Sequence, residues 1–347
     1  MDKNNLVLYR KYRPSKFSEV LGQDHITETI QKAIALGNIA HAYLFSGTRG
    51  TGKTTIARLL AQEIKTSAND LNEIDAASNR GIDDIRELRE AVTVLPFESR
   101  YKVYIIDEVH MLTKEAFNAL LKTLEEPPRH VIFVLATTEI EKIPDTILSR
   151  CQTFTFKKPS LEILKKSVLS VCKKEGLKLE NGAEDLIALL GDGSFRDTLG
   201  ILQKVISANS DKEISIQEVE KITGAPRGEL VNDFISAISE KDLDRGLKAV
   251  QQATEDSIDA QLYLKLILHK LRAILLVRFA KDMQKVVKDD FSEKDFEFIQ
   301  KIAQNKGSNL NSKTLIELID ASSQIKQSYI SKLPLELVLI KLIKDVK

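Results

Sequence analysis

Tryptophan is absent from this chain of 347 residues, and cysteine occurs only twice, as Cys151 and Cys172. Two cysteines exclude the disulfide framework of a small secreted domain and indicate a reducing, cytosolic setting. The five histidines do not cluster at ligand spacing, and no Cys/His set exists for a zinc site. We therefore expect packing or capping roles for most histidines, which are His25, His41, His110 and His130, and a core position for His269.

The chain also lacks an excess of charge of either sign, and it lacks long apolar runs. The formal net charge is only +1, so any contact with nucleic acid has to come from a local patch. No apolar run reaches the length of a membrane span, and the N-terminus has no apolar signal-peptide segment. We therefore predict no membrane contact. The abundance of Leu, Ile, Lys and Glu favours helices, and the length predicts more than one domain.

What the sequence does contain is a glycine-rich loop at 47–54, which reads GTRGTGKT and fits G-x-x-x-x-G-K-[ST] at every fixed position. Glycines let the backbone N–H groups converge on phosphate oxygens, while Lys53 adds charge at the β/γ-phosphates and Thr54 is placed for Mg²⁺. A predicted strand at 42–45 precedes the loop and a predicted helix follows it, which disfavours a chance glycine turn. The residues expected to bind the nucleotide here are Gly47, Thr48, Gly50, Thr51, Gly52, Lys53, Thr54 and Thr55.

A second motif, KVYIIDE, occupies 102–108. Its continuous apolar run is typical of a strand buried on both faces, and its acidic end lies where open parallel sheets bind ligands. We predict that Asp107 holds Mg²⁺ through water and that Glu108 orients or deprotonates the water that attacks the γ-phosphate. An acidic pair that serves only solubility is disfavoured by the phosphate loop upstream.

Three further residues carry weaker signals. Thr138 follows a predicted buried strand at 130–136, where a hydroxyl could sense the γ-phosphate, although threonines at strand ends are common. Arg150 is either a surface ion-pair residue or an arginine finger that acts on a neighbour's nucleotide. Arg80 lies in a turn before a predicted helix at 83–92. It is either a plain turn residue or a contact to DNA phosphates that reads no bases.

The first 24 residues form an arm with a basic and aromatic cluster. The cluster could bind nucleic acid, or it could cover the nucleotide base with Tyr12, Pro14 and Val20. The phosphate loop nearby favours the second interpretation. A helix is predicted next, at 26–36, ended by Gly37.

The composition changes after a last short strand, predicted at 154–156. Residues 160–224 have a helical pattern without any strand candidate longer than three residues. Within them Ser194 is a predicted N-cap, which puts Arg196 in the first turn of a helix, against the macrodipole, and indicates an outside anion. After a boundary at 224–226 the chain is helical by periodicity. It ends in a mostly apolar helix at 335–346, which has to be buried in its own core or against a partner.

Taken in order, these motifs resemble the AAA+ clamp-loader ATPases and, more narrowly, the gamma/tau family of bacterial DNA polymerase III. The resemblance covers essentially the whole chain. The segments that carry the narrower resemblance lie at 12–14, 41–47, 75–79, 118–128 and 333–337.

The resemblance implies an α/β P-loop domain of AAA+ type, with a parallel sheet flanked by helices, at residues 1–158. A small helical lid domain would follow at 159–224 and an all-α collar domain for oligomerisation at 225–347. Thr138 would be sensor 1, Arg196 sensor 2 and Arg150 the arginine finger acting in trans. The residues that would line the adenine end of the pocket are Tyr12, Arg13 and Val20.

It also implies a cytoplasmic ATPase with ATP and Mg²⁺ as cofactors. The implied partners are the other subunits of a hetero-pentameric clamp loader, the sliding clamp and primer–template DNA. ATP binding would close the subunits into a spiral that holds the clamp open, and hydrolysis triggered by DNA and clamp would release it.

The sequence departs from that family in one place. The resemblance implies a four-cysteine zinc module between the phosphate-loop helix and the strand that ends at Ile74 and Asp75, but residues 62–73 contain no cysteine. We therefore predict no bound zinc. The chain also stops soon after the implied collar, without the tail that binds polymerase and helicase in the family.

Two other functions remain to be weighed. A non-catalytic scaffold that binds nucleotide only to set assembly geometry is disfavoured by the intact set of Lys53, Thr54, Asp107 and Glu108. Another AAA+ DNA motor, such as a branch-migration helicase, is disfavoured by the Ser149-Arg150-Cys151 motif and the long helical C-terminal region.

Overall fold

The computed structural model describes residues 6–79, 81–209, 212–305 and 307–344. The chain divides into two compact units. One is formed by Met1–Ser167 with Gly191–Gly200, and the other by Val168–Leu190 with Ile201–Lys347.

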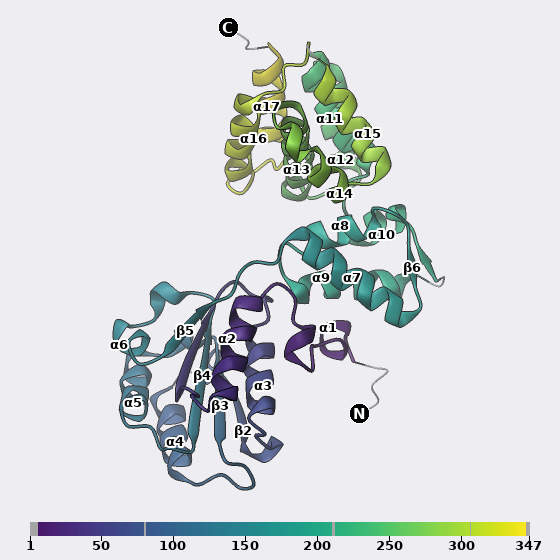
Figure 1. Cartoon of the computed structure of the whole chain (residues 1–347). Helices are drawn as coiled ribbons and strands as arrows, with labels where there is room; N and C mark the ends of the chain where they lie inside the picture. Colours follow the sequence, from purple (N-terminus) through teal and green to yellow (C-terminus); the bar gives the residue numbers. More distant parts are fainter. Residues whose placement is uncertain (1–5, 80, 210–211, 306, 345–347) are drawn as a thin grey trace. The chain divides into compact units, whose positions relative to one another are not determined.

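The first unit is built on a sheet of five parallel strands in the order β2-β3-β4-β1-β5 (Figure 1). Strands β1 and β4 are buried along their whole length, as expected for central strands covered by helices on both faces. The strands are β1 (Ala42–Ser46), β2 (Leu71–Asp75), β3 (Lys102–Asp107), β4 (Val131–Thr137) and β5 (Gln152–Thr155).

Alternate side chains of these strands enter two different cores, because successive residues of a strand point to opposite faces. One core joins Leu44 and Phe133 with helices α4 and α5, and the other joins Phe45 and Val134 with α2 and α3. The helices of this unit are α1 (Leu8–Lys11), α2 (Asp24–Ala35), α3 (Lys53–Glu63), α4 (Ile82–Thr93), α5 (Lys114–Glu125) and α6 (Asp145–Leu148).

The predicted P-loop α/β architecture is confirmed, and the boundaries of most elements agree within two residues. The last strand was expected at 154–156 but lies at Gln152–Thr155. It pairs with β1 alone as an edge strand, and both Gln152 and Thr153 are exposed. An edge strand needs no apolar run, so the sequence pattern pointed only to Phe154 and to the buried Phe156 that follows the strand.

The second unit is mostly helical, as predicted, and its short strands β6 (Lys178–Leu179) and β7 (Glu213–Ile214) pair with each other. The remaining helices of the chain are α7 (Leu161–Glu175), α8 (Ala183–Leu190), α9 (Phe195–Ala208), α10 (Ile216–Thr223), α11 (Gly228–Glu240), α12 (Leu243–Glu255), α13 (Ala260–Phe279), α14 (Gln284–Asp290), α15 (Glu293–Gln304), α16 (Ser312–Ile325) and α17 (Leu333–Lys344).

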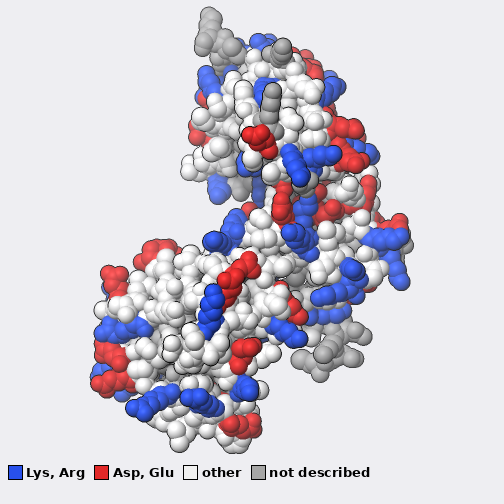
Figure 2. All heavy atoms as spheres, viewed as in Figure 1, with Lys and Arg blue, Asp and Glu red and all other residues white. Residues whose placement is uncertain are grey.

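Charged side chains of both signs are interspersed on the face shown in Figure 2, in keeping with the small net charge. Among the described residues, no helix combines the length and the apolar character needed to cross a membrane.

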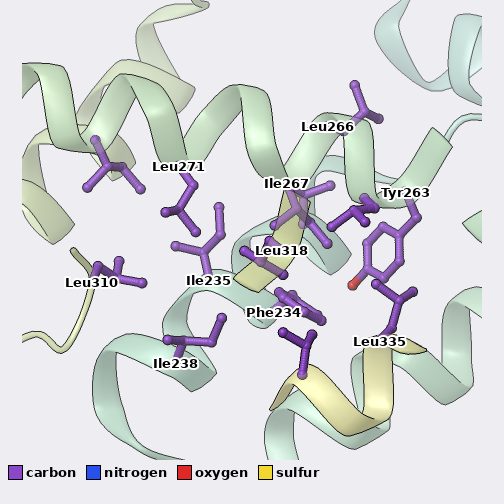
Figure 3. Packing of buried hydrophobic residues seen from close by; sticks show 14 of the residues in the cluster. Phe234, Ile235, Ile238, Tyr263, Leu266, Ile267, Leu271, Leu310, Leu318 and Leu335 are labelled. Atoms are coloured by element: carbon purple, nitrogen blue, oxygen red, sulfur yellow. The ribbon is translucent and has the colours of Figure 1, made fainter. Parts of the chain in front are cut away.

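A large apolar core holds helices α11 to α17 of the second unit together. Figure 3 shows Phe234 of α11, Tyr263 of α13 and Leu335 of α17 converging in it. The rings of Phe234 and Tyr263 meet edge to face at 5.9 Å. The last helix, α17, buries Leu335 and Leu339 here but leaves Leu337 exposed. The apolar C-terminal helix predicted from the sequence is therefore buried on one side only.

Candidate nucleotide-binding site

The glycine-rich loop runs from the end of β1 into α3, as the sequence predicts. Gly52 adopts φ of +106°, a conformation that favours glycine. Lys53 is 6% exposed, and its ammonium donates to the carbonyl oxygens of Gly47 (2.7 Å) and Thr48 (3.0 Å). Burial lowers the pKa of Lys53, and the carboxylates of Glu108 and Asp107 oppose that effect. A buried cation thus lies inside the loop, suited to an anionic ligand.

Thr54 and Asp107 meet directly, although they come from different motifs. The Thr54 hydroxyl donates to Asp107 Oδ2 at 2.8 Å. A hydroxyl and a carboxylate suit Mg²⁺, which is commonly held by one or two protein oxygens together with phosphates and water. The described residues contain no group of three or more His, Cys, Asp or Glu side chains placed to hold a metal. The donor set fits a metal shared with a nucleotide, and the absence of bound zinc stays a prediction.

Glu108 follows the end of β3 with φ of +49° and ψ of +43°. This left-handed conformation is uncommon for a residue with a side chain and is often found at functional sites. The Thr138 hydroxyl, just beyond the end of β4, donates to Glu108 Oε2 at 3.0 Å. The neighbouring strands β3 and β4 therefore bring together two residues that the sequence singled out separately.

His110 was expected only to pack or cap, but it lies against this pair. Its side chain is 5% exposed, and Nδ1 lies 3.0 Å from Thr137 Oγ1 and 3.5 Å from Glu108 Oε2. Nε2 lies 3.2 Å from Glu139 Oε1. The only sequence signal was its position two residues after Glu108, which could not reveal the contacts to the next strand.

Helix α9 begins beside the phosphate loop. The Ser194 hydroxyl accepts from the Asp197 N–H (3.2 Å), so the predicted N-cap is present, and the Phe195 N–H donates to Gly50 O at 3.0 Å. A Cβ atom at Gly50 would clash with Ser194 Oγ, which explains the need for glycine here. Arg196, in the first turn, lies over the ring of Tyr9 at 5.6 Å.

The N-terminal arm contributes a further arginine. Burial lowers the pKa of Arg13, with further lowering by Arg58, Arg196 and Arg10, while the Glu73 carboxylate opposes them. Arg13 therefore lies near three other guanidinium groups, of which Arg58 forms an ion pair with Glu73. Tyr12 ends α1, and Val20 packs against the core that contains α3.

Arg150 follows α6 and is held within its own chain. Its guanidinium contacts Glu125 Oε1 at 2.6 Å and donates to Thr146 O at 2.8 Å. The ion-pair alternative raised from the sequence thus describes Arg150 in the single chain.

Arg80, the predicted DNA contact, lies outside the described residues. Beside it, the Gly81 N–H donates to Asp84 Oδ2 at 3.0 Å, and Asp83 adds a second carboxylate to the first turn of α4. This helix start is therefore more acidic than a phosphate contact would favour.

Known families match two parts of the chain. A model described as "DNA polymerase III, delta subunit" matches residues 64–160, and one described as "DNA polymerase III subunits gamma and tau domain III" matches residues 214–347.

Curated relatives match over longer stretches. The DNA polymerase III subunit tau of Bacillus subtilis is 39% identical over 301 residues, which are 81% of this chain and 53% of the relative. The subunit tau of Escherichia coli is 39% identical over 79% of this chain and 46% of the relative. The subunit gamma of Buchnera aphidicola is 34% identical over 99% of this chain and 100% of the relative. The chain thus spans about half the length of the two tau relatives and all of the gamma relative.

Among solved structures, the RuvB Holliday junction branch migration motor of Thermotoga maritima is similar, with a TM-score of 0.53 and 20% identity. The match covers 65% of this chain and 78% of that chain. At this identity the likeness concerns the fold alone.

Proposed function

This chain belongs to the gamma/tau family of DNA polymerase III subunits, and from that membership we propose that it is an ATP-hydrolysing motor subunit of the bacterial clamp loader. In this proposal it uses ATP binding and hydrolysis to load the sliding clamp onto primed DNA. The observation that carries the proposal is the contact pair Thr54–Asp107 (2.8 Å) and Thr138–Glu108 (3.0 Å) at the mouth of the phosphate loop. A scaffold that only binds nucleotide has no need for the second contact.

The proposed chemistry is divided among these side chains. The loop N–H groups and Lys53 bind the β/γ-phosphates, and Lys53 exchanges its bonds to the Gly47 and Thr48 carbonyls for phosphate oxygens. Mg²⁺, held by Thr54 and Asp107, would neutralise charge that develops on the phosphates. Glu108 orients the attacking water and accepts its proton. Thr138, as sensor 1, keeps the Glu108 carboxylate in place.

The remaining site residues complete the nucleotide pocket in this proposal. Arg196, as sensor 2, neutralises phosphate charge from the start of α9, beside Gly50. Tyr12, Arg13 and Val20 line the adenine end.

In the proposed assembly, an arginine from a neighbouring subunit neutralises part of the charge on the γ-phosphate. We propose that the Arg150 guanidinium binds the nucleotide of a neighbouring subunit, and that its ion pair with Glu125 breaks when it binds there. A division into a nucleotide-binding domain at 1–158, a lid at 159–224 and a collar at 225–347 fits this assembly. The proposed partners are the other loader subunits, the clamp and primer–template DNA, in the cytoplasm.

The test compares rates of ATP hydrolysis. The isolated chain is expected to turn over ATP slowly, and the rate should rise when partner subunits, clamp and primed DNA are added together. Glu108→Gln should bind nucleotide but abolish the rise, because the water loses its base. An isolated chain that hydrolyses ATP at full speed, regardless of dilution, would contradict the proposal. A Glu108→Gln complex with unchanged turnover would favour the scaffold alternative.

A further inference from the structure

The buried imidazole of His110 contacts both residues that flank Thr138 in the sequence. His110 lies in the short turn Val109–Met111 that follows Glu108. Its Nδ1 lies 3.0 Å from Thr137 Oγ1, and its Nε2 lies 3.2 Å from Glu139 Oε1. One side chain from the β3 end therefore spans the segment from Thr137 to Glu139 at the end of β4.

The hydrogens of this cluster can be assigned from its donors and acceptors. Thr137 Oγ1 already accepts the Glu139 N–H at 3.0 Å, so its own hydrogen is free to be donated to Nδ1 of His110. The Glu139 carboxylate can only accept, so Nε2 carries the hydrogen. The Lys142 ammonium, which donates to Glu139 and attracts it, holds the pKa of that carboxyl below its usual range. With hydrogen on Nε2 the imidazole satisfies Thr137 and Glu139, while Nδ1 and Glu108 Oε2, 3.5 Å apart, form no hydrogen bond with each other.

We propose that His110 is a positioning residue for ATP hydrolysis, which locks the Thr137–Glu139 segment to the turn after β3 so that Thr138 holds the Glu108 carboxylate in one orientation. The inference rests on the proposed function. His110 acts through Thr138 and does not itself exchange a proton with the substrate, because Nδ1 is occupied by Thr137.

The local backbone makes such a lock necessary. Glu108 adopts a left-handed conformation, which persists only where the surroundings enforce it. Its carboxylate is 31% exposed on the side chain and has Thr138 as its hydroxyl donor. If the Thr137–Glu139 segment moved by about 1 Å, the orientation of this carboxylate would change, and misplacement on that scale can lower a rate about a hundredfold.

The experiment measures single-turnover hydrolysis of ATP by the full chain assembled with partner subunits, clamp and primed DNA. His110→Phe keeps a ring of similar size but removes both nitrogens. We expect its hydrolysis rate to fall by about a hundredfold, while KM for ATP and the stoichiometry of nucleotide binding stay at wild-type values. The matched control is His130→Phe, because His130 is a half-buried histidine of the same unit whose Nε2 contacts Val92 O at 3.1 Å. It should keep the wild-type rate.

A second variant guards against a misfolded protein. Glu139 is 38% exposed on its side chain, so Glu139→Ala should fold and should lower the rate less than His110→Phe, since Thr137 still holds the ring. Its control is Glu141→Ala, an exposed neighbour.

The outcomes separate the two proposals. A His110→Phe complex at the wild-type rate, or a Glu139→Ala rate equal to that of Glu141→Ala, overturns this inference and leaves the proposed function standing. A loss of nucleotide binding together with the rate also overturns it, because His110 would then shape the pocket as a whole. A wild-type complex that does not hydrolyse ATP overturns the proposed function, and this inference falls with it.

Discussion

At the scale of single residues, Asp70 holds the loop at 97–99, for which the sequence predicted no structure. Its carboxylate is 1% exposed and accepts the N–H groups of Phe97 (2.6 Å), Glu98 (3.0 Å) and Ser99 (2.8 Å). Burial acts to raise the pKa of Asp70, but these donors outweigh burial and hold the pKa well below its usual range. Within residues 62–73, the segment that contains no cysteine, the Asp70 carboxylate therefore fixes the chain to the loop at 97–99 before β3.

Replacing Asp70 should destabilise the fold without touching the nucleotide site. Asp70→Ala leaves three N–H groups without their acceptor, and we expect the free energy of unfolding at pH 7 to fall by about 3 kcal/mol. Urea unfolding measures this change. The folded-state pKa lies below the unfolded value of about 4, so the contribution of Asp70 is complete above that pH and declines as the pH falls further. A wild-type advantage over Asp70→Ala that grew on acidification below pH 4 would contradict the assignment.

At the scale of elements, helices α5 and α6 both supply acceptors that hold the Arg150 guanidinium in place. Glu125, at the end of α5, binds the guanidinium that follows α6, and Thr146 of α6 accepts from it as well. The ion pair lies at the surface, since the side chains of Arg150 and Glu125 are 33% and 48% exposed. A surface ion pair of this kind is worth at most about 1 kcal/mol, so a neighbour's triphosphate can compete for the arginine.

We expect Arg150→Ala to separate nucleotide binding from turnover. The variant should bind ATP nearly as the wild type does, because the phosphate loop is unchanged. Its hydrolysis in the assembled complex should fall by about a thousandfold, as for the loss of an arginine finger. The matched control is Arg129→Ala, which removes an exposed arginine of the same unit. Normal hydrolysis by the Arg150→Ala complex would show that the arginine does not act in trans.

At the scale of the whole molecule, exposed apolar side chains occur on the helices of the second unit. Helix α17 exposes Leu333 (38%), Leu337 (52%) and Ile340 (38%) along one stripe, while its other side lies in the core. Ile316 and Ile319 of α16, which packs against α17, are exposed by 57% and 56%. Exposed apolar residues that gather in this way mark interaction surfaces, which supports the proposed collar.

Leu337→Asp should therefore weaken assembly while the chain itself stays folded. The side chain is half-exposed, so the charge can be solvated in the isolated chain but not in an interface. Analytical ultracentrifugation of the chain with its partner subunits measures the effect, and the thermal unfolding of the isolated chain should change little. Leu36→Asp, at a leucine that is 75% exposed in the other unit, is the control and should assemble normally. Equal assembly of both variants would exclude the stripe from the interface.

The sequence by itself determined which segments form the site. The glycine loop, the buried strand before Asp107 and Glu108, and the N-cap at Ser194 were all predicted, because tight turns, strand burial and capping depend on residues close together in the chain. The parallel sheet flanked by helices was expected from the family resemblance. The sequence raised roles for Thr138, Arg150 and Arg196 as alternatives, the family resemblance assigned them, and they stay proposals.

Only the tertiary structure decided which of these segments meet. The order β2-β3-β4-β1-β5 places the end of β3 beside the end of β4, and Glu108 thereby reaches Thr138 across 30 positions of sequence. In the same packing, His110, expected only to pack or cap, contacts Thr137 and Glu139. Arg150 likewise forms an ion pair with Glu125. Local patterns record how each segment folds, but contacts between segments depend on strand order and helix packing, which no single stretch of sequence contains.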